Sequence, residues 1–215
     1  MIENVIFDMN GVITDDEHLH ELATQKVFET IGLTITPEIY RQYCLGRTDA
    51  SAFCDMIKDF QLKNIEVASI ISEKSIVYQQ LVADNLKVYP GVIMLIERLY
   101  QKYPLAITTS STFEEVKTVL NELYLENRFK TVVSANDVQR GKPDPEPYVL
   151  TAEKLGVLPE NCLVIEDSEN GIRSAIAAGM KCIAITNTEN RDKLTLAHYI
   201  IEDYSEITNE LLESL

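Results

Sequence analysis

A short stretch near the start of the chain combines a buried-strand pattern with acidic and amide side chains. The mostly apolar run at residues 4–7 leads straight into Asp8, and Asn10 and Gly11 then form a pair typical of tight turns. A buried strand that ends on a carboxylate is typical of the front of a catalytic site. The side chain of Asn10 is an amide and cannot carry a proton, so a reaction here cannot depend on proton exchange at position 10.

Three further segments end in groups that could join Asp8. They are Thr109 and Ser110 at the end of the run at 105–109, Lys142 in the Pro-rich loop after the run at 131–134, and the pair Glu166 and Asp167 at the end of the run at 162–167. In an open parallel sheet, ligands bind at the carboxyl ends of the strands. We therefore expect one rim of a sheet to carry a carboxylate, hydroxyls, a cation and an acidic pair.

The runs that must position these groups alternate with helical patterns. The expected strands are 4–7, 105–109, 131–134, 162–167 and 181–186, and the expected helices are 92–103, 112–124, 145–156 and 168–179. Each run is short, continuous and rich in Val and Ile, as in parallel strands that are buried on both faces. Thr112 followed by Glu115 is a capping-box pattern at a helix start. The alternation predicts an α/β fold with a doubly wound parallel sheet.

Residues 15–86 interrupt this alternation because they carry only helical patterns. An all-helical insert directly after the first strand predicts a lid over the strand ends; a helical subdomain with only a packing role is the alternative. We therefore predict a core domain of residues 1–14 and 87–215 and a helical cap domain of residues 15–86.

The composition limits the partners that the chain can have. Its 215 residues carry a net charge of −15, which disfavours binding to a nucleic-acid backbone. No apolar run approaches the ~18 residues of a membrane span, and the first residues lack the pattern of a signal peptide. Four cysteines without a CxxC spacing do not suggest a disulfide framework. We expect a cytoplasmic protein, by default a monomer, without nucleic-acid or membrane partners.

Four motifs together resemble those of the haloacid dehalogenase-like (HAD) hydrolase superfamily. They are FDMNGVITD at 7–15, TTSS at 108–111, GKPDPEPY at 141–148 and VIEDSENGIRSAIAAGM at 164–180. The motifs occur in the family's order and at its usual spacings, and they span nearly the whole chain. The helical insert is similar to the small cap of the β-phosphoglucomutase and phosphoglycolate phosphatase branch. The resemblance implies a Rossmann-like core with an inserted α-helical cap.

The resemblance also implies a Mg²⁺-dependent phosphatase that acts on a small phosphorylated metabolite. Asp8 would be the nucleophile that forms an aspartyl-phosphate. The implied Mg²⁺ ligands are Asp8, the backbone carbonyl of Asn10, Asp167 and, directly or through water, Glu166. Lys142 would offset the negative charge of the reacting groups, and Thr109 with the backbone N–H of Ser110 would hold phosphoryl oxygens. The plainer alternatives are a solvated loop lysine at 142 and helix capping by the hydroxyls.

Asn10 departs from the family pattern. Active phosphatases and mutases of the family carry an aspartate there, which protonates the leaving oxygen and then activates water. General acid–base catalysis contributes about 10²–10⁴ to the rate. The implied enzyme therefore has the other residues of the active site but a turnover lower by about that factor. Three explanations stay open: a specialised branch, an introduced change, or replacement by another group. The groups near enough in sequence are Asp15, Asp16, Glu17 and His20.

Within the cap, residues 45–53 lie where the family's cap approaches the active site. The resemblance makes Arg47, Thr48 and His20 candidates for substrate contact. The alternatives are a hinge salt bridge for Arg47 and an exposed helix histidine for His20. The mutase branch carries an arginine slightly further on, where this chain has Asp49.

Three other functions are alternatives to the phosphatase. A β-phosphoglucomutase-type phosphotransferase must hold a second phosphate, and both Asn10 and Asp49 argue against it. A haloacid dehalogenase needs no Mg²⁺, and the acidic pair at 166–167 argues against it. The alternative that is not an enzyme is a catalytically lapsed protein that binds phosphate and metal.

Overall fold

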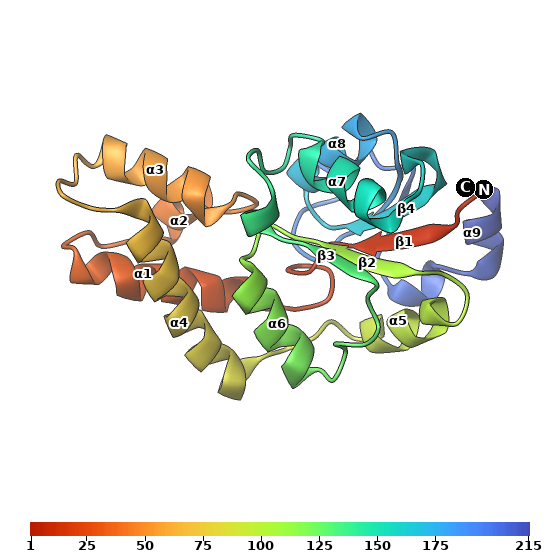
Figure 1. Ribbon diagram of the computed structural model, residues 1–215, viewed down its shortest axis with the longest axis horizontal. Helices are drawn as coiled ribbons and strands as arrows, with labels where there is room; N and C mark the ends of the chain where they lie inside the picture. Colours follow the sequence, from red (N-terminus) through yellow and green to blue (C-terminus); the bar gives the residue numbers. More distant parts are fainter.

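Six parallel strands form one sheet in the order β3-β2-β1-β4-β5-β6 in the computed structural model, which describes residues 1–215 (Figure 1). The strands are β1 (Asn4–Phe7), β2 (Leu105–Thr108), β3 (Thr131–Val133), β4 (Cys162–Glu166), β5 (Lys181–Ile185) and β6 (Tyr199–Ile201). The chain winds outward from β1 to β3 and then returns to pair β4 with the other edge of β1. The strand order thus reverses between β1 and β4, and ligands bind at the carboxyl ends of strands at such a point.

Helices cover both faces of the sheet. They are α5 (Val92–Tyr100), α6 (Phe113–Glu122), α7 (Glu146–Leu155), α8 (Glu169–Ala177) and α9 (Asn209–Ser214), with 3₁₀ turns at Ala135–Asp137, Pro159–Asn161 and Tyr204–Glu206. Successive side chains of a strand point to opposite faces. Val5 and Phe7 of β1 accordingly belong to a core that includes α5 and α6 side chains, whereas Ile6 belongs to a second core that includes α7 and α8 side chains. The predicted doubly wound α/β fold is confirmed.

Four helices form an insertion between β1 and β2. They are α1 (Glu17–Thr30), α2 (Pro37–Tyr43), α3 (Asp49–Asp59) and α4 (Val67–Asn85). Phe28, Phe53 and Met56 are fully buried in a core of their own within this insertion. Figure 1 shows that the insertion lies beyond the carboxyl ends of the strands, so it faces the rim that carries the motifs. The helical insertion is confirmed, while the division into domains at residues 15 and 86 remains a prediction.

The end of the chain departs from the expected pattern. The sequence patterns did not predict the edge strand β6 or the terminal helix α9. β6 consists of only three residues, Tyr199–Ile201, and an apolar run this short does not by itself distinguish a strand. No helix of the chain combines the length and the apolar character that crossing a membrane requires.

Candidate active site

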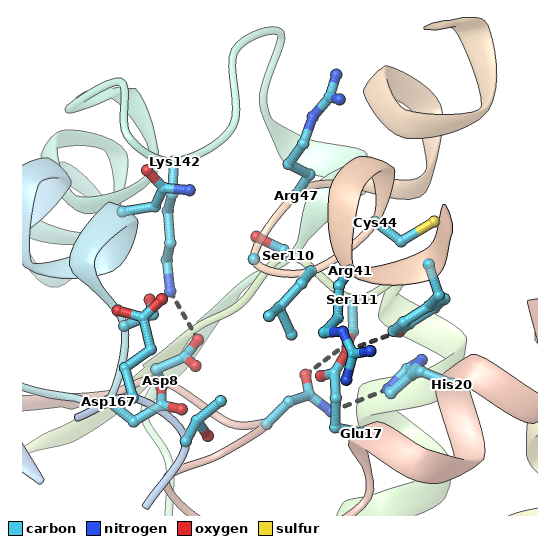
Figure 2. Close-up of a pocket in the computed structure, with 18 of the residues that line it drawn as sticks. Asp8, Glu17, His20, Arg41, Cys44, Arg47, Ser110, Ser111, Lys142 and Asp167 are labelled. Atoms are coloured by element: carbon cyan, nitrogen blue, oxygen red, sulfur yellow. Dashed lines mark hydrogen bonds and ion pairs between the residues drawn. The ribbon is translucent and has the colours of Figure 1, made fainter. Parts of the chain in front are cut away.

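Asp8 and Lys142 meet at the carboxyl end of β1. The Lys142 Nζ donates to Asp8 Oδ1 at 2.7 Å and to Glu166 Oε1 at 2.7 Å (Figure 2). It also donates to the backbone carbonyl of Thr108 at 3.2 Å, and all three charged side chains are buried. Burial acts to lower the pKa of Lys142, but the two carboxylates outweigh it and raise the pKa above its usual value. The lysine therefore stays charged beside Asp8.

Protein donors occupy the carboxylate of Glu166. Its Oε1 accepts hydrogen bonds from Lys142 and from the Tyr148 hydroxyl at 3.0 Å. Its Oε2 accepts from the backbone N–H groups of Asp167 (2.9 Å) and Ser168 (3.1 Å) and from the Ser168 hydroxyl. Burial acts to raise the pKa of Glu166, but Lys142 and these hydrogen bonds lower it. Glu166 thus holds Lys142 in place, and it has fewer free lone pairs for a metal than Asp167 has.

Three buried carboxylates form a cluster that suits a divalent cation. Asp8, Glu166 and Asp167 place ligand oxygens within 4.8 Å of one another. Burial raises the pKa of Asp8 to about 7 against the opposing effect of Lys142, and burial with the charge of Glu166 raises the pKa of Asp167 well above its usual value. One lysine therefore does not neutralise three carboxylates. Mg²⁺ binds hard oxygen ligands such as carboxylates, and it is attracted to a site where negative charges outnumber positive ones. The cluster can therefore hold such an ion.

Two glycines allow the backbone to approach these carboxylates. Gly11 has a φ of +82°, and a Cβ there would lie 1.9 Å from Asp167 Oδ2. A Cβ on Gly171 would lie 1.7 Å from Glu166 Oε1. Any larger residue at either position would displace a carboxylate of the cluster.

The side chain of Asn10 is bonded on both of its ends. Its Nδ2 donates to the Asp16 carboxylate, with 3.1 Å to each oxygen. Its Oδ1 accepts from the hydroxyls of Ser111 at 2.7 Å and Thr109 at 3.2 Å. Asp16 is fully buried and also accepts a hydrogen bond from the Tyr78 hydroxyl. The amide of Asn10 thus complements the buried carboxylate of Asp16. A carboxylate at position 10 would instead repel the carboxylate of Asp16.

The hydroxyls expected to hold phosphate have different surroundings. Ser110 and Ser111 line a pocket above Asp8, whereas Thr109 does not. The Thr109 hydroxyl donates to Asn10 and accepts the backbone N–H of Ser111 at 3.1 Å. The next residue, Thr112, begins α6 with the predicted capping box.

A buried ionic network, which the sequence patterns did not indicate, joins the insertion to the core. Lys74 of α4 donates to Glu115 of α6 at 2.9 Å and lies 3.0 Å from Asp49 of α3. Its Nζ also lies 2.7 Å from Nδ1 of His20, which is buried rather than exposed. The other ring nitrogen of His20, Nε2, lies 3.0 Å from Asn10 Nδ2 and 3.8 Å from the Asp16 carboxylate, so His20 links this network to the Asn10–Asp16 pair.

The predicted cap residues divide into two groups. His20 and Arg47 line a polar pocket of about 250 Å³, whereas Thr48 does not. The Arg47 guanidinium points away from the acidic cluster in Figure 2 and donates to Asp55 at 2.6 Å, which is a salt bridge within the insertion. Thr48 caps α3 and packs against the core, since a Cβ on Gly141 would lie 2.7 Å from Thr48 Cγ2.

Comparison with known proteins gives consistent matches over most of the chain. Residues 5–185 match the family model described as haloacid dehalogenase-like hydrolase. The chain is 34% identical to the phosphorylated carbohydrates phosphatase of Thermotoga maritima, over 85% of this chain and 84% of that protein. It is 28% identical to the fructose-1-phosphate phosphatase YqaB of Escherichia coli, over 84% of this chain and 95% of that protein. The crystal structure of CbbY from Rhodobacter sphaeroides in complex with phosphate is similar, with a TM-score of 0.88, 25% identity and 96% of each chain covered.

Proposed function

This chain belongs to the haloacid dehalogenase-like hydrolase family, and we propose that it is a Mg²⁺-dependent phosphatase of small phosphorylated metabolites, sugar phosphates in particular. The observation that carries the proposal is the convergence of Asp8, Lys142 and Asp167 where the strand order reverses. Relatives named for phosphorylated carbohydrates and fructose 1-phosphate support the substrate class. A cytoplasmic setting and a monomeric state remain predictions.

Asp8 is the nucleophile in this proposal. Lys142 engages its Oδ1, which leaves Oδ2 to attack phosphorus. The bond from Asp8 to phosphorus forms while the bond from phosphorus to the leaving oxygen breaks, and the leaving oxygen takes up a proton. Water then attacks phosphorus, which releases inorganic phosphate and restores the carboxylate of Asp8. The charge of Lys142 stabilises the phosphoryl oxygens, and Ser110 and Ser111 line the same side of the pocket.

The acidic cluster would hold the metal ion. Bound Mg²⁺ would supply positive charge to the transferring phosphoryl group and to the carboxylates around it. Asp167 and Asp8 would be direct ligands together with the backbone carbonyl of Asn10. Glu166 would act mainly by holding Lys142, because its oxygens already accept five hydrogen bonds.

Asn10 makes this phosphatase slow. Its amide occupies the place of the family's proton donor but cannot give up a proton near neutral pH, which costs about 10²–10⁴ in rate. Of the neighbouring groups that could replace it, Glu17 and His20 line the pocket, Asp15 is exposed, and Asp16 is buried behind the amide. The proton of the leaving group then comes from water or from a pocket group less well placed than an acid at position 10.

Phosphate release measures this proposal directly. We expect the chain to release phosphate from an aryl phosphate and from fructose 1-phosphate with Mg²⁺ and not with EDTA. Asp8→Asn is the matched control, since it keeps the shape of the side chain and removes the nucleophile. Equal release by the control would refute the role of Asp8. A β-phosphoglucomutase-type enzyme would instead require a sugar bisphosphate activator, and a lapsed protein would bind Mg²⁺ without turnover even as Asn10→Asp.

A further inference from the structure

The side chain of Asn10 has no proton to give to a leaving oxygen. It lines the pocket beside Asp8, and its Nδ2 donates to the Asp16 carboxylate with 3.1 Å to each oxygen. Its Oδ1 accepts from the hydroxyls of Ser111 and Thr109. Both ends of the amide are therefore occupied by protein partners, and an amide does not release its protons near neutral pH.

The basic side chains on either side of Asn10 direct their nitrogen atoms at other protein groups. Lys142 has three N–H groups, and its Nζ donates to two carboxylates and to a backbone carbonyl. His20 is buried, with Nε2 3.0 Å from Asn10 Nδ2 and Nδ1 2.7 Å from Lys74 Nζ. Neither residue therefore directs a proton at the space beside the nucleophile.

The remaining carboxylates of the pocket act as acceptors. Outside the acidic cluster, the pocket is lined by three: Glu17, Asp49 and Glu189. Their partners are the Tyr40 hydroxyl at 2.6 Å, Lys74 Nζ at 3.0 Å and the backbone N–H of Glu169 at 2.9 Å, respectively. Figure 2 shows Glu17 on the opposite side of the pocket from Asp8 and Lys142. The pocket thus holds acidic residues, but none of them offers a proton beside Asp8.

We propose that this site takes phosphate from acidic oxygens, and from acyl phosphates above all, much faster than from the alcohol oxygen of a sugar. The inference rests on the proposed function and adds a class of substrate to it. An alcohol, like water with its pKa of about 15.7, is a poor leaving group unless its oxygen is protonated. A carboxylic acid has a pKa of about 4, so its oxygen departs as a carboxylate without a proton. A site without an acid therefore loses rate on the sugar ester but not on the acyl phosphate.

The reaction with an acyl phosphate exchanges like for like. Oδ2 of Asp8 forms a bond to phosphorus while the bond from phosphorus to the carboxyl oxygen of the substrate breaks. The leaving carboxylate keeps the electron pair of that bond and takes up no proton. The phosphorylated Asp8 is itself an acyl phosphate, so little free energy separates reactants from products. Water then attacks phosphorus, which restores the carboxylate of Asp8 and leaves the protons of the water on phosphate and in solvent.

The size of the preference follows from the missing acid. General acid–base catalysis contributes about 10²–10⁴ to a rate, and in the first step it is lost only for leaving oxygens that need a proton. We expect acetyl phosphate to phosphorylate Asp8 at least about 10²-fold faster than fructose 1-phosphate does. Hydrolysis of the phosphorylated Asp8 is the same step for every substrate. The preference is therefore measured in the first turnover rather than in steady phosphate release.

Rapid-quench kinetics with saturating substrate and Mg²⁺ measures this first turnover as the appearance of phosphorylated protein. Asn10→Asp supplies an acid at position 10, so the ratio of the acetyl phosphate rate to the fructose 1-phosphate rate should fall by about tenfold or more. The double variant Asn10→Asp/Asp16→Asn supplies the same acid if Asn10→Asp does not fold. Substituted phenyl phosphates differ in the acidity of the leaving phenol but little in shape. Their rates should rise steeply with that acidity in the unchanged chain and less steeply in the variants.

The outcomes separate this inference from the phosphatase proposal. Phosphorylation by acetyl phosphate and by fructose 1-phosphate at rates within about threefold of each other would refute the inference and leave the phosphatase. A ratio as large in the variants as in the unchanged chain would also refute it, because the preference would then reflect only the reactivity of acetyl phosphate. No phosphorylated protein and no phosphate release with any of these substrates would refute the phosphatase itself, and the inference with it.

Discussion

Exchanging the side chains of Asn10 and Asp16 tests whether the missing proton donor limits this enzyme. Asn10→Asp alone would place two carboxylates at the 3.1 Å separation now spanned by an amide hydrogen bond. A hydrogen bond to a buried charged group contributes about 1.5–3 kcal/mol, and two carboxylates this close retain one shared proton. We therefore expect Asn10→Asp to lose about 2–3 kcal/mol of stability at pH 8, or roughly 4–12 °C for a chain of this size.

The pH dependence of that loss has a defined sign. The folded variant would hold a proton on the carboxylate pair above the pH at which the unfolded chain releases it. Stability is then lost as pH rises from the unfolded pKa toward the raised folded pKa. The variant should be closest in stability to the parent near pH 5 and furthest from it at pH 8, as followed by thermal unfolding. The double variant Asn10→Asp/Asp16→Asn restores one amide facing one carboxylate, so it should recover most of the lost stability.

Turnover distinguishes the catalytic role from the structural one. Asn10→Asp and the double variant both supply an acid at position 10, and each should raise turnover of an aryl phosphate by roughly tenfold or more. Asp16→Asn alone supplies no acid there and should give no increase. Asn10 is followed by Gly11, and an Asn-Gly pair is prone to deamidation to aspartate. Peptide mass spectrometry must therefore accompany each assay to show whether residue 10 is asparagine or aspartate. Turnover unchanged in both variants that carry an acid at position 10 would refute the reasoning, because the proton would then come from elsewhere.

Three other perturbations have expected outcomes. Lys142→Met removes the cation beside Asp8. The rate of phosphate release should fall by at least about 10²-fold, because charge stabilisation in the transition state is lost. A fall of less than roughly threefold would contradict the role of Lys142 in stabilising the transition state. The raised pKa of Asp8, about 7, means that metal-free protein loses stability as pH rises from about 4 to 7. Mg²⁺ should therefore raise the melting temperature more at pH 8 than at pH 6, and an equal increase at both pH values would contradict the shift. Lys74→Met leaves Glu115 buried without its partner and should lower the free energy of unfolding, measured with urea, by about 3–5 kcal/mol. The control Lys58→Met changes an exposed lysine and should lower it by about 0.5 kcal/mol. Similar losses in both variants would show that the buried pair is not stabilising.

The sequence predicted the parts of the site that the sheet topology determines. Asp8 and Asp167 directly follow β1 and β4, which are neighbours in the sheet, so their side chains had to meet once the strands were recognised. Lys142 lies in a loop beyond β3, and its Pro-rich motif indicated a fixed position. The helical insertion was predictable for a similar reason, because a long stretch without strand patterns interrupted an otherwise regular alternation.

Contacts set by tertiary packing were not predictable in this way. Lys74 and Glu115 are 41 residues apart on two helices, and the capping box already accounted for Glu115. The bond from Asn10 to Asp16 depends on how the chain turns between β1 and α1. Both examples involve polar side chains whose partners lie on another element, and no periodicity in the sequence indicates such a partner.

Chemical identification of the phosphorylated residue tests the central claim most directly. The enzyme is mixed with Mg²⁺ and a sugar phosphate, stopped during turnover, and treated with borohydride, which reduces an aspartyl-phosphate to homoserine. Peptide mass spectrometry then locates the reduced residue. We predict conversion at position 8 in the unchanged chain and none in Asp8→Asn. Conversion at another carboxylate, or steady phosphate release with no converted residue, would contradict the proposal that Asp8 attacks phosphorus.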